Sequence, residues 1–311
     1  MKFKKPKFWD LTKPNIIAYL LLPFSYLLFL INLLNKKKAI KIKNIKTICI
    51  GNIYVGGTGK TPISIEINEI LKNLNFKTGF IKKKYNDQID EQILLSKKGN
   101  LFCEKNRIEC LKRALNENIE IAIFDDGLQD KNLNYDFSFI CFNVNNWIGN
   151  GLLLPAGPLR ENLKNIKNYD GIFLNGNGED VSKIKNDIYK IDSNIKIFES
   201  KYTPTNLDKL DKSKNYLAFS GIGNPKSFIK TLKNNGFNVI KILSFPDHYT
   251  YSEKDIINIE KSAKELNAEI ITTEKDFMRL HKKNKKNINY LEIKLQIVNE
   301  KEIIDFLKKK L

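Results

Sequence analysis

Residues 46–62 read KTICIGNIYVGGTGKTP, and this stretch decides how the rest of the sequence is interpreted. Its first five residues predict a short buried strand, and the apolar spacing from Pro62 to Leu74 predicts a helix after the glycines. Strand, glycine-rich loop and helix together form a P-loop, in which backbone N–H groups and the positive end of a helix face phosphate oxygens. The stretch therefore predicts a nucleoside triphosphate site.

The end of this loop carries the residue types that a triphosphate and its magnesium ion require. Lys60 brings a compact cation to the terminal phosphates, and the hydroxyl of Thr61 is a ligand for Mg²⁺. One departure is Tyr54, which stands where a P-loop usually has its first glycine. A glycine-rich turn with a chance Gly-Lys-Thr is the alternative, and the flanking strand and helix disfavour it. The predicted phosphate-binding residues are Tyr54, Val55, Gly56, Gly57, Thr58, Gly59, Lys60 and Thr61.

A second motif is the stretch at 119–129, IEIAIFDDGLQ, in which a mostly apolar run is followed by two aspartates. A carboxylate at the carboxyl end of a buried strand is where P-loop proteins hold Mg²⁺. Because neighbouring side chains of a strand point to opposite sides, we expect one of Asp125 and Asp126 to face the metal and the other to turn toward the substrate. A plain Asp-Asp-Gly turn is the alternative, and the preceding P-loop favours the metal site.

Strand-like and helix-like segments alternate after the loop, which is typical of an α/β fold with a mostly parallel sheet flanked by helices. A polar connection at 199–214 precedes a second α/β set, and 311 residues suffice for two modest domains. We expect strands at 78–81, 119–124, 137–142, 171–174, 196–198, 216–219, 239–243 and 269–272. The expected domains are a membrane-associated helical segment at 1–40, a P-loop NTPase-like domain at 41–205 and a smaller α/β domain at 206–311.

The N-terminal region contains an uncharged stretch at 16–34. As a helix it would span roughly 28 Å, just enough for a bilayer core. Pro23 interrupts it and lysines flank it on both sides, which favours a helix or bent hairpin that dips into the cytoplasmic leaflet. A single span and a buried core helix are the alternatives. No small-residue cleavage site of a secretory signal follows it.

The composition is strongly basic, with 53 lysines and arginines against 35 acidic residues and a net charge of +18. The few arginines and the many lysines, asparagines and isoleucines indicate a genome-wide bias, which weakens the argument from charge. A membrane surface or a phosphorylated substrate fits the charge, and without a recognisable binding motif we expect no nucleic acid partner. The four cysteines form no Cys-x-x-Cys pair, which suits a reducing cytosol and disfavours zinc. We expect a monomer.

Two further clusters contain candidate site residues. The loop at 149–161, GNGLLLPAGPLRE, ends in Arg160, a candidate phosphate ligand, and Glu161, a candidate support for the metal. A plain surface loop is the alternative. Asp247 and His248 follow a predicted strand, and a histidine beside an aspartate is a candidate general base or simply a loop residue.

Taken in order, these motifs resemble those of the tetraacyldisaccharide 4'-kinase family, over nearly the whole chain. The LPAGPLRE string is very specific, and the family's P-loop also lacks the first glycine. The matching stretches are Gly51–Pro62, Asp125–Gln129, Gly149–Glu161, Gly221–Pro225, Phe245–His248 and Thr273–Asp276.

The resemblance implies transfer of the γ-phosphoryl group of ATP to the 4'-hydroxyl of tetraacyldisaccharide 1-phosphate, a lipid A precursor, at the cytoplasmic face of the bacterial inner membrane. It implies that Lys60 and the loop amides bind the phosphates. It also implies that Thr61, Asp125 and Asp126, with Glu161, arrange Mg²⁺. The alternative function is a membrane-associated P-loop ATPase or GTPase coupled to a protein partner.

The resemblance further implies an aspartate–histidine dyad that activates the sugar hydroxyl, and it assigns His248 and Asp90 to this role. The chain departs from the family pattern here, because the Gly-Asp-Glu-Pro segment reads Ile89-Asp-Glu-Gln92. The preceding Ser-Arg-Gly-Tyr segment reads Lys82-Lys-Lys-Tyr85. Asp87 is therefore a competing candidate for the partner of His248.

Overall fold

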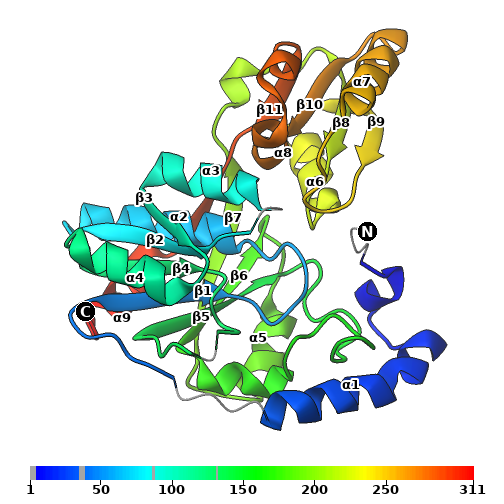
Figure 1. Ribbon diagram of the computed structural model, residues 1–311. Helices are drawn as coiled ribbons and strands as arrows, with labels where there is room; N and C mark the ends of the chain where they lie inside the picture. The colour runs from blue at the N-terminus through cyan, green and yellow to red at the C-terminus, as the bar shows by residue number, and fades with distance from the viewer. Residues whose placement is uncertain (1–4, 35–38, 86–87, 131) are drawn as a thin grey trace. The chain divides into compact units, whose positions relative to one another are not determined.

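The computed structural model describes residues 5–34, 39–85, 88–130 and 132–311, which form two compact units (Figure 1). The P-loop unit contains residues 5–84, 98–201 and 296–311, and the smaller unit contains the described residues of 85–97 and 202–295. Two segments thus differ from the expected domain ranges. Residues 85–97 belong to the smaller unit, and 296–311 return to the P-loop unit.

Tertiary contacts explain both differences. Asp90, in the first segment, is bound by Arg279 of the smaller unit. In the second, the ring of Phe306 packs on Phe137, Phe139 and Phe198 of the P-loop unit. Neither contact has a signature in the local sequence, because each joins residues far apart in the chain.

The P-loop unit is organised around an eight-stranded sheet in the order β12-β7-β6-β5-β1-β4-β2-β3. From β7 to β3 every adjacent pair is parallel, which confirms the expected fold class. The strands are β1 Lys46–Gly51, β2 Thr78–Lys83, β3 Asn100–Glu104, β4 Ile121–Asp125, β5 Phe137–Asn143, β6 Gly171–Gly176, β7 Lys196–Pro204 and β12 Ile293–Ile297. The helices are α1 Ile16–Leu34, α2 Lys60–Asn73, α4 Arg107–Asn116, α5 Ser182–Tyr189 and α9 Glu300–Lys308, with short 3-10 turns at Lys7–Asp10 and Leu163–Asn168.

The central strands of this sheet are buried on both sides, as their continuous apolar sequences require. In β1, Ile48, Cys49 and Ile50 have no exposed surface. The register pairs Ile50 with Asp125, so β1 and β4 end side by side. This places the loop after β1 and the aspartates after β4 at the same edge of the sheet, where parallel α/β proteins bind their ligands.

The smaller unit contains a parallel four-stranded sheet in the order β11-β10-β8-β9. Alternate residues of β8 face opposite sides: Leu217 packs with apolar residues of α7, and Tyr216 with those of α6. The two helices therefore cover opposite faces of the sheet. The strands are β8 Asn215–Ser220, β9 Asn238–Ser244, β10 Glu269–Thr273 and β11 Ile288–Leu291, and the helices are α3 Ile89–Lys98, α6 Pro225–Asn234, α7 Glu253–Glu265 and α8 Glu274–Arg279, with 3-10 turns at Leu207–Lys209 and Lys282–Lys285.

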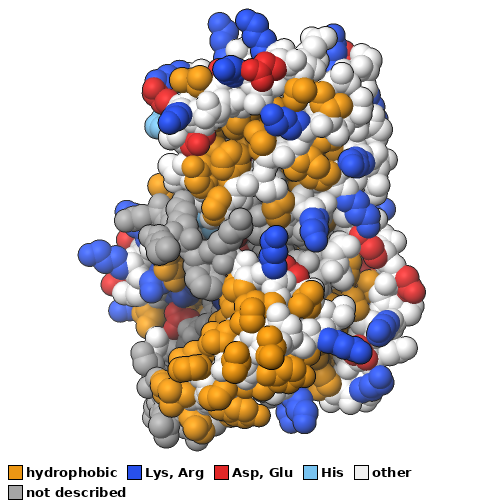
Figure 2. Space-filling view, turned by 90° about the vertical axis from the view of Figure 1, so that its right-hand side faces the viewer, with side chains coloured by type: hydrophobic (Ala, Val, Ile, Leu, Met, Phe, Trp, Pro, Cys, Tyr) orange, Lys and Arg blue, Asp and Glu red, His pale blue; other side chains and the backbone are white. Residues whose placement is uncertain are grey.

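Helix α1 is a single helix with Pro23 inside it, and most of its described apolar side chains face outward. Ile16 is 76% exposed and Leu20 is 71% exposed, whereas Ala18 and Ser25 are buried. Figure 2 shows hydrophobic side chains gathered in one large area on this side of the unit. The helix is therefore not a core helix. Among the residues that the structure describes, no helix has the length and apolar character needed to cross a membrane.

Candidate active site

The loop between β1 and α2 has the backbone conformation that its glycines allow. Gly56 and Gly59 have φ angles of 137° and 85°, in the left-handed region that strains other residues. Gly59 is the N-cap of α2, so the first N–H groups of the helix open toward the loop. Asn52 and Asn175 donate side-chain hydrogen bonds to carbonyl groups of the loop, which hold it in this shape.

Tyr54 shows why the first glycine of the P-loop is dispensable here. Its backbone forms a β-bridge with Leu159, an extended conformation that any residue adopts. Its ring is fully buried, and its hydroxyl donates a hydrogen bond of 2.8 Å to Asp10. Burial and the nearby Asp10 carboxylate raise the pKa of Tyr54. The ring lies beside Gly56 of the loop, and the hydroxyl attaches the N-terminal segment to the loop.

Asp125 ends β4 with its side chain fully buried. Its Oδ2 atom accepts hydrogen bonds from Thr61 Oγ1 at 3.0 Å and from Lys82 Nζ at 2.7 Å. The hydroxyl of Ser64 lies 3.5 Å from Oδ1. A hydroxyl and a carboxylate are oxygen ligands of the kind that Mg²⁺ prefers, and Mg²⁺ in nucleotide sites typically takes only one or two of them from the protein.

Asp126 makes a separate set of contacts. Its φ of 63° lies in the left-handed region and turns the chain out of the strand. Backbone strain of this kind is common at functional sites. Its carboxylate lies 3.8 Å from Lys60 Nζ and 3.7 Å from Arg160 Nη1. Arg160 also donates to Gln129 at 2.8 Å. Asp126 thus joins two cations that are candidate phosphate ligands.

Glu161 is held by residues of its own segment. Its Oε2 atom accepts hydrogen bonds from Tyr169 at 3.0 Å and from Asn165 at 3.4 Å. In the described part of the chain, no group of three or more histidine, cysteine, aspartate or glutamate side chains is close enough to hold a metal ion. Glu161 as a metal ligand therefore stays a prediction.

The loop at 149–161 is built into the nucleotide site. Val55 donates its backbone N–H to Pro158 O at 2.9 Å, and Arg160 donates to Ile53 O at 2.7 Å. The hydroxyl of Ser25, in α1, donates a hydrogen bond of 3.0 Å to Leu153 O of the same loop. The loop therefore connects the P-loop with the apolar N-terminal helix.

In the smaller unit, the structure brings His248 and Asp90 together. Their Nδ1 and Oδ1 atoms are 3.4 Å apart, and the side chain of Asp90 is 1% exposed. Burial alone would raise the pKa of Asp90, but the hydrogen bond to His248 and the charges of Lys275 and Arg279 hold it well below its usual range. A carboxylate kept ionised in this way holds the neighbouring histidine ring in a fixed orientation. Asp87, the competing candidate, lies outside the described residues.

Arg279 is a site residue that the sequence reasoning missed. It donates to Asp90 Oδ2 at 2.7 Å and to Asp276 Oδ1 at 2.9 Å, and its own side chain is only 8% exposed. Asp276 also accepts from Gly221 N at 3.0 Å, and Gly221 O accepts from His248 N at 3.1 Å. Asp276, the last residue of the Thr-Glu-Lys-Asp segment, is therefore linked to His248 through Gly221. The one available signal was the rarity of arginine in this chain.

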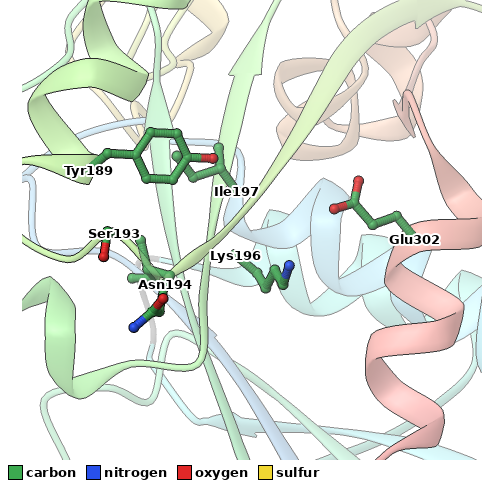
Figure 3. A pocket seen from close by; sticks show the side chains of 7 residues that line it. Tyr189, Ser193, Asn194, Lys196, Ile197 and Glu302 are labelled. Atoms are coloured by element: carbon green, nitrogen blue, oxygen red, sulfur yellow. The ribbon is translucent and has the colours of Figure 1, made fainter.

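The cavity of about 290 Å³ drawn in Figure 3 lies elsewhere in the P-loop unit. It is lined by Tyr189, Ser193, Asn194, Ile195, Lys196, Ile197 and Glu302, from the end of α5, the start of β7 and α9. None of the predicted site residues lines it. The candidate site is therefore defined by its chemistry and not by this cavity.

A P-loop on a parallel sheet, with a hydroxyl–carboxylate pair beside its lysine, defines a nucleotide-dependent P-loop enzyme. A sequence profile described as "LpxK: Tetraacyldisaccharide-1-P 4'-kinase" matches residues 17–311. The chain belongs to the tetraacyldisaccharide 4'-kinase family. It is an ATP-dependent kinase of lipid A biosynthesis.

Individual relatives agree with the family match. The tetraacyldisaccharide 4'-kinase of Pelagibacter ubique is 53% identical over 309 residues, which cover 99% of this chain and 98% of the relative. That of Rickettsia canadensis is 38% identical over 318 residues, with 96% and 95% covered. The crystal structure of LpxK from Aquifex aeolicus in complex with ATP has the same fold, with a TM-score of 0.69, 24% identity and coverage of 94% and 99%.

Proposed function

We propose that the P-loop unit binds ATP with Mg²⁺ and that His248 of the smaller unit activates the 4'-hydroxyl of the lipid acceptor. The observation that carries the nucleotide half is the 3.0 Å contact between Thr61 and Asp125, at the end of the strand beside the P-loop. Lys60 and the backbone amides of the loop bind the phosphates in this account. ATP as the nucleotide is supported by the fold shared with the ATP-bound Aquifex aeolicus protein.

The residues present fit a magnesium ion. Thr61 and Asp125, whose side-chain oxygens lie 3.0 Å apart, would hold the ion, and both are oxygen ligands of the kind that Mg²⁺ prefers. Asp126 stands next in the chain and lies 3.8 Å from Lys60 Nζ, a contact that supports a role for it near the same phosphates. When bound, Mg²⁺ neutralises charge that develops on the transferred phosphoryl group. Lys60 and Arg160 supply further positive charge from the protein itself.

The acceptor hydroxyl needs a group to take its proton, and His248 fits this role. Its Nδ1 lies 3.4 Å from the Asp90 carboxylate, so we assign the transfer of the proton to Nε2, which lies 3.9 Å from Asp247 Oδ1. Asp90 orients the ring and stabilises the positive charge that the ring gains with the proton. The second carboxylate oxygen of Asp90 is held by Arg279, so the aspartate itself is not the base.

Substitutions at Thr61 and Asp125 test the metal half of the proposal. Thr61→Val keeps the shape and removes the hydroxyl, and we expect lipid phosphorylation to fall by about a hundredfold or more. Thr61→Ser is the matched control, because it keeps the hydroxyl and should retain most of the activity. Asp125→Asn should raise the Mg²⁺ concentration needed for half-maximal rate. Full activity of Thr61→Val and of Asp125→Asn at low Mg²⁺ would refute the assignment.

We also propose that α1 docks the enzyme on the cytoplasmic face of the inner membrane, where its lipid acceptor resides. Leu20, Phe24 and Leu27 are all more than half exposed, and their spacing puts them on one side of the helix. Such a face binds in the interfacial plane of a bilayer without spanning it.

Vesicle flotation of the full chain tests the docking surface. Each leucine side chain withdrawn from water contributes about 1.5–3 kcal/mol, so the double variant Leu20→Glu/Leu27→Glu should bind vesicles about a hundredfold less tightly or worse. Val298→Glu is the control, because Val298, at 61% exposed, falls between Leu20 at 71% and Leu27 at 56% but lies outside α1. Equal flotation of the double variant and the wild type would place the membrane contact on another surface.

A further inference from the structure

Lys82 is a buried cation that pairs with Asp125 and has no part in the phosphoryl transfer proposed above. The register of β2 and β4 pairs Ile81 with Phe124, so Lys82 and Asp125 follow as neighbours on one face of the sheet. The side chain of Lys82 is 2% exposed and that of Asp125 is 0% exposed. A lysine is almost never buried to this degree unless its charge is paired, so the position is built around the aspartate.

The contacts of the carboxylate define what Lys82 does to it. Oδ2 accepts from both Lys82 Nζ at 2.7 Å and Thr61 Oγ1 at 3.0 Å, which uses the two lone-pair directions of that oxygen. Oδ1 has the more distant hydroxyl of Ser64 at 3.5 Å. A cation that binds Asp125 through Oδ2 must therefore displace the ammonium or the hydroxyl.

The electrostatic consequence is that the positive charge of Lys82 balances the negative charge of the Asp125 carboxylate. The carboxylates after β4 are both matched by cations, Asp125 by Lys82 and Asp126 by Lys60 and Arg160. The protein alone thus offers a divalent ion little net negative charge. The phosphates of a nucleotide would restore that charge, because they bring several negative oxygens to the same place.

We propose that Lys82 is a positioning residue that holds the Asp125 carboxylate toward Thr61 and keeps it closed to free Mg²⁺ until nucleotide phosphates are bound. This rests on the proposed role of Thr61 and Asp125 in binding Mg²⁺. Metal then enters together with ATP, and the nucleotide-free enzyme has little affinity for the ion. Lys82 sets the order of binding without touching the reacting atoms.

Calorimetric titration of the 311-residue chain with Mg²⁺, with and without ADP, tests this role. Lys82→Met keeps the length of the side chain and removes its charge, leaving Asp125 free to attract the ion. We expect the nucleotide-free variant to bind Mg²⁺ about tenfold more tightly than the wild type or better, and Mg²⁺ to raise its melting temperature. Lys84→Met is the matched control, since Lys84 is exposed on the same segment, and it should behave as the wild type.

Two further variants separate this proposal from the one on which it rests. The double variant Lys82→Met/Asp125→Asn removes both charges, should fold without the ion pair, and should lose the gained Mg²⁺ affinity. Lys82→Met with wild-type Mg²⁺ affinity, with or without ADP, would overturn the role of Lys82 and leave the metal site standing. If Asp125→Asn instead bound Mg²⁺ with ADP as tightly as the wild type, the metal assignment itself would fail.

Discussion

Replacing Arg279 with methionine should disturb the smaller unit more than any surface substitution. Arg279 lies 2.7 Å from Asp90 and 2.9 Å from Asp276, and both carboxylates are almost completely buried. Methionine keeps apolar volume but leaves both without their shared cation, with Lys275 still 3.7 Å from Asp90. Removing one partner of a buried ion pair costs about 3–5 kcal/mol, so the smaller unit should open about a hundredfold more often or worse.

The loss of stability caused by Arg279→Met should increase with pH. In the wild type, the lowered pKa of Asp90 stabilises the folded state at every pH above the ordinary pKa of a carboxyl group. This stabilisation is lost as the pH falls through the lowered pKa. Burial raises the pKa of Asp276, and Arg279 opposes the rise. Without Arg279, both carboxyl groups bind protons more readily in the folded state. The difference from the wild type should therefore widen with rising pH, by at most about 1.4 kcal/mol per pH unit for each proton.

Hydrogen exchange followed by mass spectrometry suits this test, because Trp9 and Trp147 both lie in the P-loop unit and tryptophan fluorescence would not report on the smaller unit. Wild type and Arg279→Met are compared at the same pH, so that intrinsic exchange rates cancel in the ratio for peptides of β8. The ratio should be larger at about pH 8 than at about pH 6. His248, Lys275 and Tyr251 also face these carboxylates and are present in both proteins.

Arg113→Met is the control, since Arg113 is 56% exposed and lies in the P-loop unit. It should leave exchange of the smaller unit unchanged. A ratio near one for Arg279→Met, or a ratio that shrinks as pH rises, would refute the reasoning.

Two further predictions concern the P-loop. Lys60→Ala should lower lipid phosphorylation by about a hundredfold or more, because it removes the cation that we assign to the terminal phosphates. Thermal melting without nucleotide should stay close to that of the wild type, and normal turnover would contradict the role. Gly59→Ala forces a side chain into a φ of 85°, which should cost about 1–2 kcal/mol of stability and weaken ATP binding. Gly178→Ala is its control, because φ is 91° there in open space, and it should lose similar stability but keep ATP affinity; equal loss of ATP affinity in both variants would argue against a local effect.

The nucleotide half of the site was predictable because its residues are close in sequence or end adjacent strands. Lys60 and Thr61 follow one strand directly, and the apolar run before Asp125 predicted the second. Lys82 was not predictable, because its contact with Asp125 requires that β2 lies beside β4 in the sheet order. Strand β3 was also missed, since its five residues NLFCE begin and end with polar side chains.

The residues that hold His248 in place were harder to predict, because they too come from distant segments of the chain. His248 was singled out by its neighbour Asp247, but Asp90 came only from the family resemblance. Arg279 is 189 residues away from Asp90 along the chain, and no local pattern indicates that they meet. Local sequence predicts strands, loops and caps, whereas ion pairs between distant segments depend on the completed fold.

The most direct test of the account is transfer of label from γ-labelled ATP to tetraacyldisaccharide 1-phosphate by the His248→Ala variant, with ATP binding measured on the same protein. We predict that ATP still binds with wild-type affinity and that lipid labelling falls by about a hundredfold to ten-thousandfold. Lipid labelling at the wild-type rate would show that another group accepts the proton of the sugar hydroxyl.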